Sequence, residues 1–219
     1  MTLEEKKYWI EAYKKYPTGN VSDAMDNLEI RRGVVLGLHA LDNHQPKAAG
    51  FALTVQQMRR KTAYDGKNLA RQGGIIDSET QEGDILVIDM GGIMDVCTGG
   101  ALLAVRAQMR GVNGELTNGC LRDADEIAEL GFPVYCAGTV PVKSARDVET
   151  IGVNVPVMMG GVQICPGDLI LMDRTGVVCV PQDRLEEVLA EAVKINERED
   201  KMGTLIRAGH SIKEARMIK

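Results

Sequence analysis

The segment Glu82-Gly83-Asp84-Ile85-Leu86-Val87-Ile88-Asp89-Met90-Gly91-Gly92 carries the clearest fold signal in this chain. A Gly-Asp turn precedes four apolar residues and an aspartate, and the same order recurs in Pro166-Gly167-Asp168-Leu169-Ile170-Leu171-Met172-Asp173-Arg174-Thr175-Gly176. Continuous apolar runs of this length are typical of strands that are covered on both faces. Each segment therefore predicts a tight turn that leads into a buried strand of an α/β domain. We interpret the likeness as two similar strand beginnings, not as an internal duplication.

Further strands and helices are expected on either side of these segments. From about residue 33, short runs rich in Val, Ile and Leu are separated by glycine and aspartate, as in the strands of α/β domains. Between the two segments we expect a helix over 101–110 that ends at Gly111, a strand over 114–117, and a helix over 123–130 that ends at Gly131.

Helices are also expected at both ends of the chain. Thr2 and Glu5 have the spacing of a capping box at the start of a helix over 2–16, and a second short helix is expected to begin at Asn20 or Ser22. The tail shows apolar residues at helical spacing and a second capping box, Ser211 with Glu214. We therefore predict a single domain over 1–219, with N-terminal helices over 1–30, a core over about 31–181 and C-terminal helices over about 182–219.

The composition fits a globular domain that binds neither nucleic acid nor membrane. The 219 residues are 44% hydrophobic and 26% charged, with a formal net charge of -5. Phosphate recognition needs a concentrated basic face, and the one short basic cluster, Arg59-Arg60-Lys61, is interpreted as a solvated surface, with steering of an anionic substrate as the alternative. The polar N-terminus and the lack of a long apolar run predict a cytoplasmic protein.

The cysteines and histidines show no pattern of a metal site or a disulfide framework. The five cysteines have no C-x-x-C spacing and are expected to be reduced and mostly buried. The histidines are too far apart in sequence to indicate a metal cluster, and we interpret each as a surface or packing residue. These residues are Cys97, Cys120, Cys136, Cys165, Cys179, His39, His44 and His210.

Two glycines open the predicted helix in Gly99-Gly100-Ala101-Leu102-Leu103. The free N–H groups of a helix's first turn and its dipole form an anion site, and glycine lets a carboxylate approach the backbone closely. Paired glycines before a helix also occur simply as turn residues, so both interpretations stay open.

An arginine and three carboxylates crowd the junction Asn118-Gly119-Cys120-Leu121-Arg122-Asp123-Ala124-Asp125-Glu126. In the structural interpretation, Asp123 is an N-cap with Glu126 three residues later, and Arg122 is its solvated partner. In the functional interpretation, Asp123 binds a divalent cation such as Mg²⁺ or Mn²⁺, and Arg122 stabilises a developing oxyanion. The residues by themselves leave both interpretations open.

These two segments occur with further motifs in an order that resembles the RraA-like family. The motifs are Gly99 to Leu103, Gly111, Gly119-x-x-Arg122-Asp123-x-x-Glu126, Gly131-Phe132-Pro133-Val134, Asn154-Val155-Pro156-Val157, Gly160-Gly161-Val162 and Pro166-Gly167-Asp168. The family includes class II, metal-dependent aldolases of 4-hydroxy-4-methyl-2-oxoglutarate and 4-carboxy-4-hydroxy-2-oxoadipate. The resemblance implies an α/β "swivelling" β/β/α domain with flanking N- and C-terminal helices, assembled as a homotrimer or homohexamer with active sites between subunits.

The resemblance also implies a role for individual residues. Arg122 would bind the oxygen of a small 2-oxo acid, and Asp123 would hold Mg²⁺ or Mn²⁺ directly or through water. The carboxylate of the 2-oxo acid would bind at Gly99, Gly100 and the amides of Leu102 and Leu103. Further metal contacts through water would come from Glu126, or from Glu197 or Glu199 of a neighbouring subunit's C-terminal helix.

The implied reaction is the retro-aldol cleavage of a 4-hydroxy-2-oxo acid, which releases pyruvate, and related members decarboxylate a 2-oxo acid. The metal and Arg122 would stabilise the enolate that forms when the C3–C4 bond breaks. One position departs from the pattern, because Ala101 stands where the aldolases and the oxaloacetate decarboxylases carry an acidic residue. Asp95 or Glu126 is the candidate replacement.

Three alternatives compete with this reaction. Lys143 is the candidate for a Schiff-base aldolase, but its sequence neighbours give no apolar or cationic setting that would favour a neutral amine. The family's namesake binds and inhibits ribonuclease E, so a non-catalytic regulatory protein that binds ribonuclease E or another partner is the alternative function, which Ala101 leaves open. A methyltransferase is set aside because no G-x-G-x-x-G motif is present.

Overall fold

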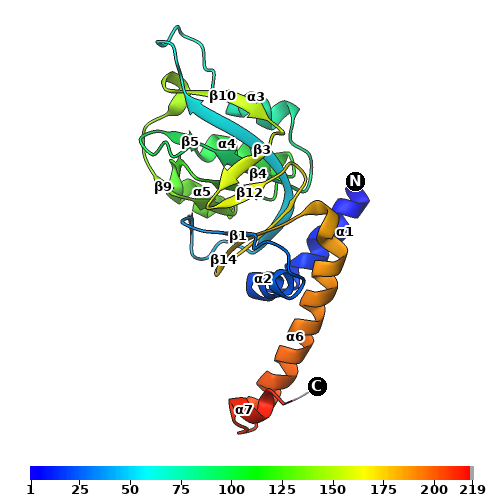
Figure 1. Cartoon of the computed structure of the whole chain (residues 1–219). Coiled ribbons are helices and arrows are strands. Elements are labelled where there is room, and N and C mark those ends of the chain that lie inside the picture. The colour runs from blue at the N-terminus through cyan, green and yellow to red at the C-terminus, as the bar shows by residue number, and fades with distance from the viewer. Residues whose placement is uncertain (218–219) are drawn as a thin grey trace.

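The computed structural model describes residues 1–217, and a mixed β-sheet lies at its centre (Figure 1). Within these residues nine strands form this sheet, in which β10 (Val148–Val153) pairs with the second half of β3. The others, in sheet order, are β1 (Val34–Val35), β14 (Gly176–Val180), β13 (Leu169–Asp173), β3 (Ala48–Arg59), β4 (Asp84–Asp89), β6 (Gly114–Thr117), β8 (Val134–Cys136) and β2 (His39–Ala40). The expected α/β class is confirmed.

The long strand β3 organises the sheet. It pairs antiparallel with β13 and parallel with β4, so that Phe51 is level with both Leu169 and Asp84. The two Gly-Asp segments therefore lie on either side of β3, and every residue of β4 is buried, as predicted. The two strands run in opposite directions although their sequences are alike, because a turn sequence sets how a strand begins but not which way the chain returns to the sheet.

The strands β5 (Cys97–Gly99) and β7 (Cys120–Leu121) of a smaller parallel sheet lead into the two helices predicted between the Gly-Asp segments. The third strand of this sheet is β9 (Gly138–Thr139), and a separate hairpin joins β11 (Val157–Met159) to β12 (Val162–Ile164). The helices beside it are α3 (Gln72–Ser78), α4 (Ala101–Met109) and α5 (Ala124–Leu130), and a short 3₁₀ turn, η1 (Ser144–Arg146), follows β9. Gly111 and Gly131 end α4 and α5 with φ of 80° and 65°, which confirms both predicted helix ends.

The buried carboxyl of Glu115 joins the two sheets. Its Oε1 on β6 accepts a hydrogen bond from Thr98 Oγ1 on β5 at 3.0 Å. Burial raises the pKa of Glu115 from 4.5 to about 7, and the hydrogen bond from Thr98 only partly offsets this rise. The junction between the sheets therefore contains an acid that titrates near neutral pH.

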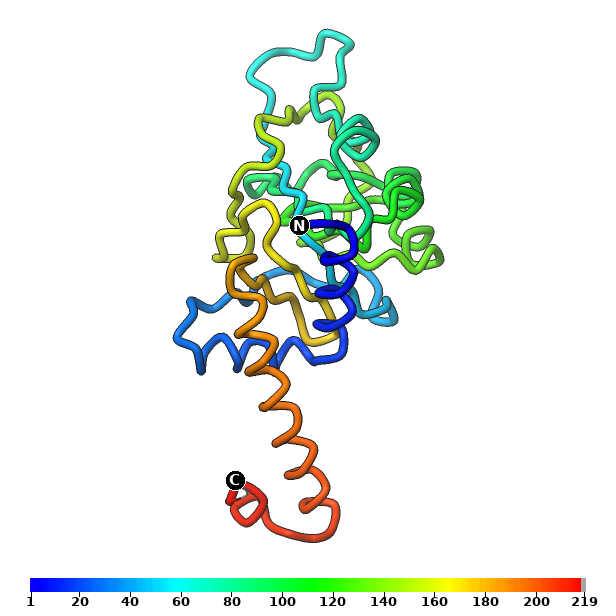
Figure 2. Tube along the Cα trace, turned by 90° about the vertical axis from the view of Figure 1, so that its right-hand side faces the viewer, coloured from blue at the N-terminus to red at the C-terminus, as the bar shows by residue number. Residues whose placement is uncertain are grey.

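Helices flank the core at both ends of the chain. They are α1 (Leu3–Lys14), α2 (Thr18–Asn27), α6 (Leu185–Arg207), which follows the turn η2 (Gln182–Arg184), and α7 (Ile212–Ala215). Both predicted capping boxes, at Thr2 and at Ser211, are confirmed. The first half of α6 packs on the domain, whereas its second half and α7 extend away from the sheets (Figures 1 and 2). No helix within residues 1–217 combines the length and the apolar character that a bilayer crossing requires.

The expected start of the second helix, at Asn20 or Ser22, was wrong. The helix α2 begins at Thr18, directly after Pro17. The Asp173 carboxylate, at the end of β13, accepts hydrogen bonds from the Thr18 N–H and hydroxyl, both at 2.8 Å. A distant carboxylate therefore does the capping that the sequence pattern assigns to a local side chain.

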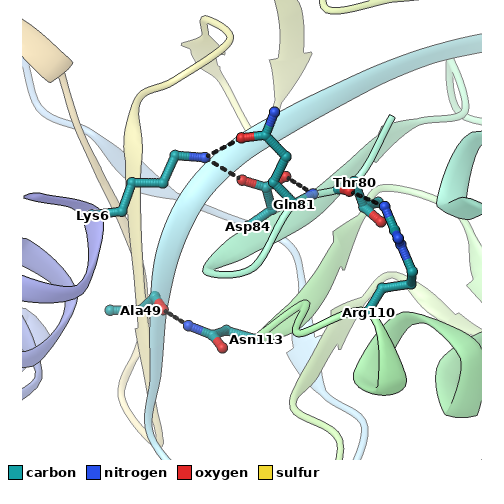
Figure 3. A network of polar contacts seen from close by, with 7 residues as sticks. All are labelled: Lys6, Ala49, Thr80, Gln81, Asp84, Arg110 and Asn113. Carbon is teal, nitrogen blue, oxygen red and sulfur yellow. Dashed lines mark hydrogen bonds and ion pairs between the residues drawn. The ribbon is translucent and has the colours of Figure 1, made fainter. Parts of the chain in front are cut away.

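A polar network fastens α1 to the start of β4 (Figure 3). Lys6 forms an ion pair of 2.9 Å with Asp84, whose other oxygen accepts a hydrogen bond from the Gln81 N–H at 2.8 Å. Nearby, Asn113 Nδ2 donates to the Ala49 carbonyl oxygen at 2.8 Å. The aspartate of the first Gly-Asp turn thus also anchors the N-terminal helix.

Replacing Glu115 by glutamine tests the buried acid. The pKa of Glu115 in the folded state lies above its ordinary value of 4.5. Its contribution to stability is therefore fully present below pH 4.5 and is lost as the pH rises through about 7. The Glu115→Gln variant keeps an acceptor for Thr98 but cannot ionise. The free energy of unfolding of the wild-type protein should fall by up to about 3 kcal/mol as the pH rises from about 4.5 to about 7, and the variant should not show this fall. Urea unfolding between about pH 4 and about pH 8 measures this, and parallel curves for the two proteins would contradict it.

Candidate active site

The glycine pair and the Arg122-Asp123 pair meet at the carboxyl ends of two neighbouring strands. The strands β5 and β7 are parallel, with Gly99 level with Leu121, and the Arg122 N–H donates to the Gly99 carbonyl oxygen at 3.1 Å. Gly100 then begins α4, and Asp123 begins α5. Parallel pairing therefore brings together two segments that are more than a helix apart in sequence.

Gly100 is needed for close approach rather than for an unusual backbone angle. Its φ of -157° is ordinary extended backbone. A Cβ at this position would lie 2.4 Å from Asp123 Oδ2 and 2.8 Å from Arg122 Cγ. The side chains of both predicted functional residues thus lie directly against the Gly100 backbone, and any larger residue would displace them.

Asp123 occupies the N-cap position of α5, as the structural interpretation expects, but the capping bond that this interpretation implies is not formed. Its backbone is left-handed, with φ of 56° and ψ of 45°, and its side chain makes no capping bond to α5. Instead, Oδ2 accepts a hydrogen bond from the Ala101 N–H at 3.2 Å and lies 3.4 Å from Arg122 Nε. The Asp123 carboxylate, at the end of β7, therefore caps α4, the helix that follows the neighbouring strand β5.

The first turn of α4 keeps one amide for a ligand. The Leu103 N–H donates to the Gly100 carbonyl oxygen at 3.0 Å, and the Ala101 N–H is taken by Asp123. The Leu102 N–H has no acceptor among the residues that the structure describes. Of the two amides expected to bind a carboxylate, Leu102 remains free and Leu103 is already engaged.

A cavity of about 200 Å³ lies beside this helix start. Gly99, Gly100 and Arg122 line one part of it, as do Leu102 and Leu103. Asp123 touches Gly100 and Arg122 but does not line the cavity itself, and its side chain is 36% exposed. The predicted substrate-binding residues therefore share one cavity, and the predicted metal-binding carboxylate stands at its edge.

Several residues of the cavity were not identified as site residues from the sequence. They are Asn68, Gln72, Cys97, Thr98, Ser144 and Ala145, whereas Lys143, which also lines the cavity, was named only as a Schiff-base candidate. Gln72 Nε2 donates to Ser144 Oγ at 3.2 Å, which ties α3 to η1 in the lining of the cavity. No local motif marks Gln72 and Ser144, because the contact between them joins α3 to the distant turn η1.

The residues present fit a cation that keeps most of its water, not a cation enclosed by protein ligands. Within residues 1–217, no three His, Cys, Asp or Glu side chains are grouped so that they could hold a metal. Asp123 still offers Oδ1, and Mg²⁺ commonly binds through one or two carboxylates together with water and substrate. Asp125 and Glu126, both exposed in the first turn of α5, are the other carboxylates of this junction, and Glu126 is the one that the resemblance assigns to the metal.

The remaining candidate carboxylates have other surroundings. Glu197 and Glu199 are exposed on α6, the helix that runs away from α4 and α5 in Figure 1. Only a second copy of the chain could bring them to Asp123. Asp95, the suggested replacement for an acid at Ala101, forms an ion pair with Arg59.

The basic cluster is not a fully solvated surface, contrary to our interpretation. The Arg60 side chain is 2% exposed and donates to the Lys67 carbonyl oxygen and to Asp65. Lys61 stays exposed, and Arg59 is held by Asp95. Arg60 therefore has a structural role, because it holds together the loop that follows β3.

The cysteines and histidines behave as expected. All five thiols are free, and four are buried, with Cys165 intermediate. Burial raises the pKa of the Cys97 thiol at the cavity, and the Arg122 guanidinium partly offsets that rise. His39, His44 and His210 are exposed.

With this fold and site in view, comparison with known proteins identifies the class of protein. The chain belongs to the RraA-like family, described as Aldolase/RraA, whose family model matches residues 18–179. A Halalkalibacterium halodurans protein named "Putative 4-hydroxy-4-methyl-2-oxoglutarate aldolase" is 32% identical over 85% of this chain and 82% of its own length. Protein DlpA of Legionella pneumophila is 30% identical over 91% of this chain, which spans 32% of the length of DlpA.

Solved structures agree with this family. An uncharacterized protein of Pseudomonas syringae has a TM-score of 0.84 and 26% identity, covering 96% of this chain and 98% of that protein. Streptomyces coelicolor RraAS2, described as an unusual member of the RNase ES inhibitor RraA protein family, has a TM-score of 0.79 and 29% identity, covering 91% and 98% of the two chains. The expected RraA-like fold is confirmed.

Substituting Gly100 by alanine should displace the Arg122–Asp123 pair while the fold persists. The new methyl group would overlap both side chains, and overpacking of this kind costs about 1–3 kcal/mol. Gly74, which has open space around its missing Cβ inside α3, is the matched control, and Gly74→Ala should be neutral or stabilising by about 0.5–1 kcal/mol. Crystal structures and urea unfolding of both variants check this. An unmoved Arg122–Asp123 pair in Gly100→Ala would sink the idea.

The left-handed backbone of Asp123 predicts an order of stability among variants at this position. Both Asp123→Gly and Asp123→Ala remove the carboxylate, so their difference reports the backbone alone. Alanine is disfavoured in this conformation by about 1–2 kcal/mol, whereas glycine is not. The glycine variant should therefore unfold at higher urea concentration, and the reverse order would argue against a strained backbone here.

Proposed function

We propose that this protein is a divalent-metal-dependent lyase that cleaves a 4-hydroxy-2-oxo acid by a retro-aldol reaction and releases pyruvate. The observation that carries the proposal is the meeting of Arg122, Asp123 and the start of α4 at one small cavity. The choice of substrate rests on the Halalkalibacterium relative, which is named a putative 4-hydroxy-4-methyl-2-oxoglutarate aldolase. Decarboxylation of a 2-oxo acid is a related reaction that the same site would support.

Each group has a chemical task in this reaction. The free Leu102 amide and the dipole of α4 bind the carboxylate of the 2-oxo acid. The Arg122 guanidinium donates to the keto oxygen and stabilises the negative charge that develops there as the C3–C4 bond breaks. Asp123 orients Arg122 from 3.4 Å, and Gly100 leaves room for both.

Asp123 is also the residue that would hold Mg²⁺ or Mn²⁺, through its free oxygen. A bound cation supplies Lewis-acid stabilisation to the same developing charge. The two oxygens of the Asp123 carboxylate have different partners in this proposal. Oδ2 accepts the hydrogen bond from the Ala101 N–H, and Oδ1 would bind the cation. The lack of a side-chain acid at Ala101 leaves this site with fewer carboxylates than the aldolase pattern has.

We further propose that the active form is a homotrimer or homohexamer. The second half of α6 projects from the domain, and Glu197 and Glu199 are exposed on it. A second copy could place one of these carboxylates near Asp123, where it would contact the metal through water and accept the proton of the C4 hydroxyl. The free, mostly buried thiols fit a reducing compartment such as the cytoplasm.

A regulatory protein without catalysis is the second candidate. Two observations favour it, namely the missing acid at Ala101 and the likeness to RraAS2, which is described within a family of RNase ES inhibitors. In that case the protein would bind a ribonuclease E-type partner and release no pyruvate. The intact Arg122–Asp123 geometry favours catalysis over this alternative.

A lactate dehydrogenase-coupled assay with 4-hydroxy-2-oxo acids, oxaloacetate and Mg²⁺ or Mn²⁺ tests the proposal. Pyruvate should appear with at least one substrate, EDTA should abolish it, and Arg122→Ala or Asp123→Ala should lower kcat by about 10²–10³. Arg106→Ala is the matched control, because Arg106 lies on the exposed side of α4 in an ion pair with Asp77. Absence of pyruvate from every substrate, together with capture of a ribonuclease E-type partner, would establish the regulatory function instead.

A further inference from the structure

The buried hydroxyl of Thr98 lies within hydrogen-bond distance of two acceptors. Its Oγ1 is 3.0 Å from Glu115 Oε1 on β6 and 3.3 Å from the Cys120 carbonyl oxygen on β7. A hydroxyl carries a single proton and donates one hydrogen bond, although it can accept others at the same time. The protonation state of Glu115 therefore decides which of the two acceptors receives the proton of Thr98.

The two protonation states of Glu115 give two hydrogen-bond arrangements. A protonated carboxyl donates to Thr98 Oγ1, and the Thr98 hydroxyl then donates to the Cys120 carbonyl oxygen, so that a directed chain joins β6 through β5 to β7. An ionised carboxyl has released its proton to solvent and can only accept. The Thr98 hydroxyl then donates to the carboxylate, and Cys120 loses that bond.

This hydrogen-bond chain lies directly beneath the candidate active site. Thr98 precedes Gly99 on β5, and Cys120 lies two residues before Arg122 at the end of β7. The next contact between these strands is the hydrogen bond from the Arg122 N–H to the Gly99 carbonyl oxygen, at 3.1 Å. The bond from Thr98 to Cys120 therefore stabilises the strand pairing that places the Arg122 side chain against Gly100.

Glu115 is the group of this region that changes its charge near neutral pH. It is level with Leu86 of β4 and Val134 of β8, which belong to an apolar cluster, and burial raises the pKa of Glu115 to about 7. Burial also raises the pKa of the neighbouring thiols of Cys120 and Cys136, that of Cys136 to about 11, so both thiols stay neutral. The buried residues that α4 and α5 contribute to the cluster are apolar, namely Ala104, Ala107 and Ile127.

We infer that Glu115 and Thr98 form a pH-sensitive positioning pair, which sets how firmly β5 holds β7 beneath the candidate active site. With Glu115 protonated, Thr98 bonds to Cys120 across the two strands and Arg122 keeps its place. With Glu115 ionised, this cross-strand bond is lost. The consequence for catalysis rests on the proposed function, in which Arg122 stabilises the developing charge, and kcat should fall as Glu115 ionises.

An NMR titration of the full chain between about pH 5 and about pH 9 tests the pair without turnover. The carbon shift of the Glu115 side-chain carboxyl reports its ionisation. The proton and nitrogen shifts of the Arg122 amide report the bond from Arg122 to Gly99. In the wild-type protein the carboxyl and the amide should titrate together, with a common midpoint at about pH 7.

Three variants make the titration specific. Glu115→Gln keeps a donor for Thr98 but cannot ionise, so the Arg122 amide should stay near its low-pH position throughout. In Thr98→Val the Glu115 carboxyl should still titrate, whereas the Arg122 amide should no longer follow it. Thr54→Val is the matched control, because Thr54 is buried and donates to the Val155 carbonyl oxygen without contact to an acid, and it should keep the coupled titration.

The pH profile of pyruvate release gives the second measurement. Between about pH 6 and about pH 8, kcat of the wild-type protein should fall relative to that of Glu115→Gln by about fivefold, the effect of losing one ordinary hydrogen bond. Equal profiles of the two proteins would overturn the effect on catalysis.

The outcomes separate this inference from the proposed function. If the Arg122 amide does not follow the Glu115 carboxyl in the wild-type protein, or if the carboxyl does not titrate in this range, the positioning pair is wrong and the proposed lyase stands. If the two groups titrate together but no substrate yields pyruvate, the positioning pair stands and the proposed function is wrong.

Discussion

The site depends on the contact of two side chains with the backbone of one glycine. Asp123 and Arg122 come from the end of β7, and both lie against Gly100 at the end of β5, where a single methyl group would overlap them. Because the carboxylate of Asp123 bonds the Ala101 N–H, it also holds the start of α4 in place. One close approach thus fixes the orientation of the guanidinium, the direction of a helix dipole and the edge of the cavity.

The larger sheet makes that contact possible. The strand β3 holds β4 in parallel, β4 holds β6, and the Thr98–Glu115 hydrogen bond then ties β6 to the small sheet beneath the cavity. Buried apolar side chains fill the space between the two sheets and α4 and α5, including Ile88, Ala104 and Ile127. Gly99 and Gly100 therefore lie above tightly packed and hydrogen-bonded strands, and a preorganised site requires such support.

Two features of this region lower stability. Asp123 has a left-handed backbone that non-glycine residues rarely adopt, and Glu115 is a carboxyl buried without a cation. Local interactions alone would not select either residue at its position. Their cost is offset by the packing of the surrounding buried side chains.

The sequence by itself determined the local features. Buried strands follow the two Gly-Asp turns, α4 and α5 end at glycines, and α1 begins at the capping box of Thr2. Each of these features depends on backbone angles and hydrogen bonds within a few residues. The order of the motifs, through their resemblance to the RraA-like family, also predicted that Arg122 and Gly100 belong to one site.

Only the tertiary structure decided how distant segments share their polar groups. The opposite directions of β4 and β13, the capping of α2 by Asp173, the bond from Ala101 to Asp123 and the place of Lys143 at the cavity all depend on contacts between residues far apart in the chain. Such contacts form only after the strands have found their order in the sheet. A local pattern indicates which groups need a partner, and the packed fold determines which partner each group receives.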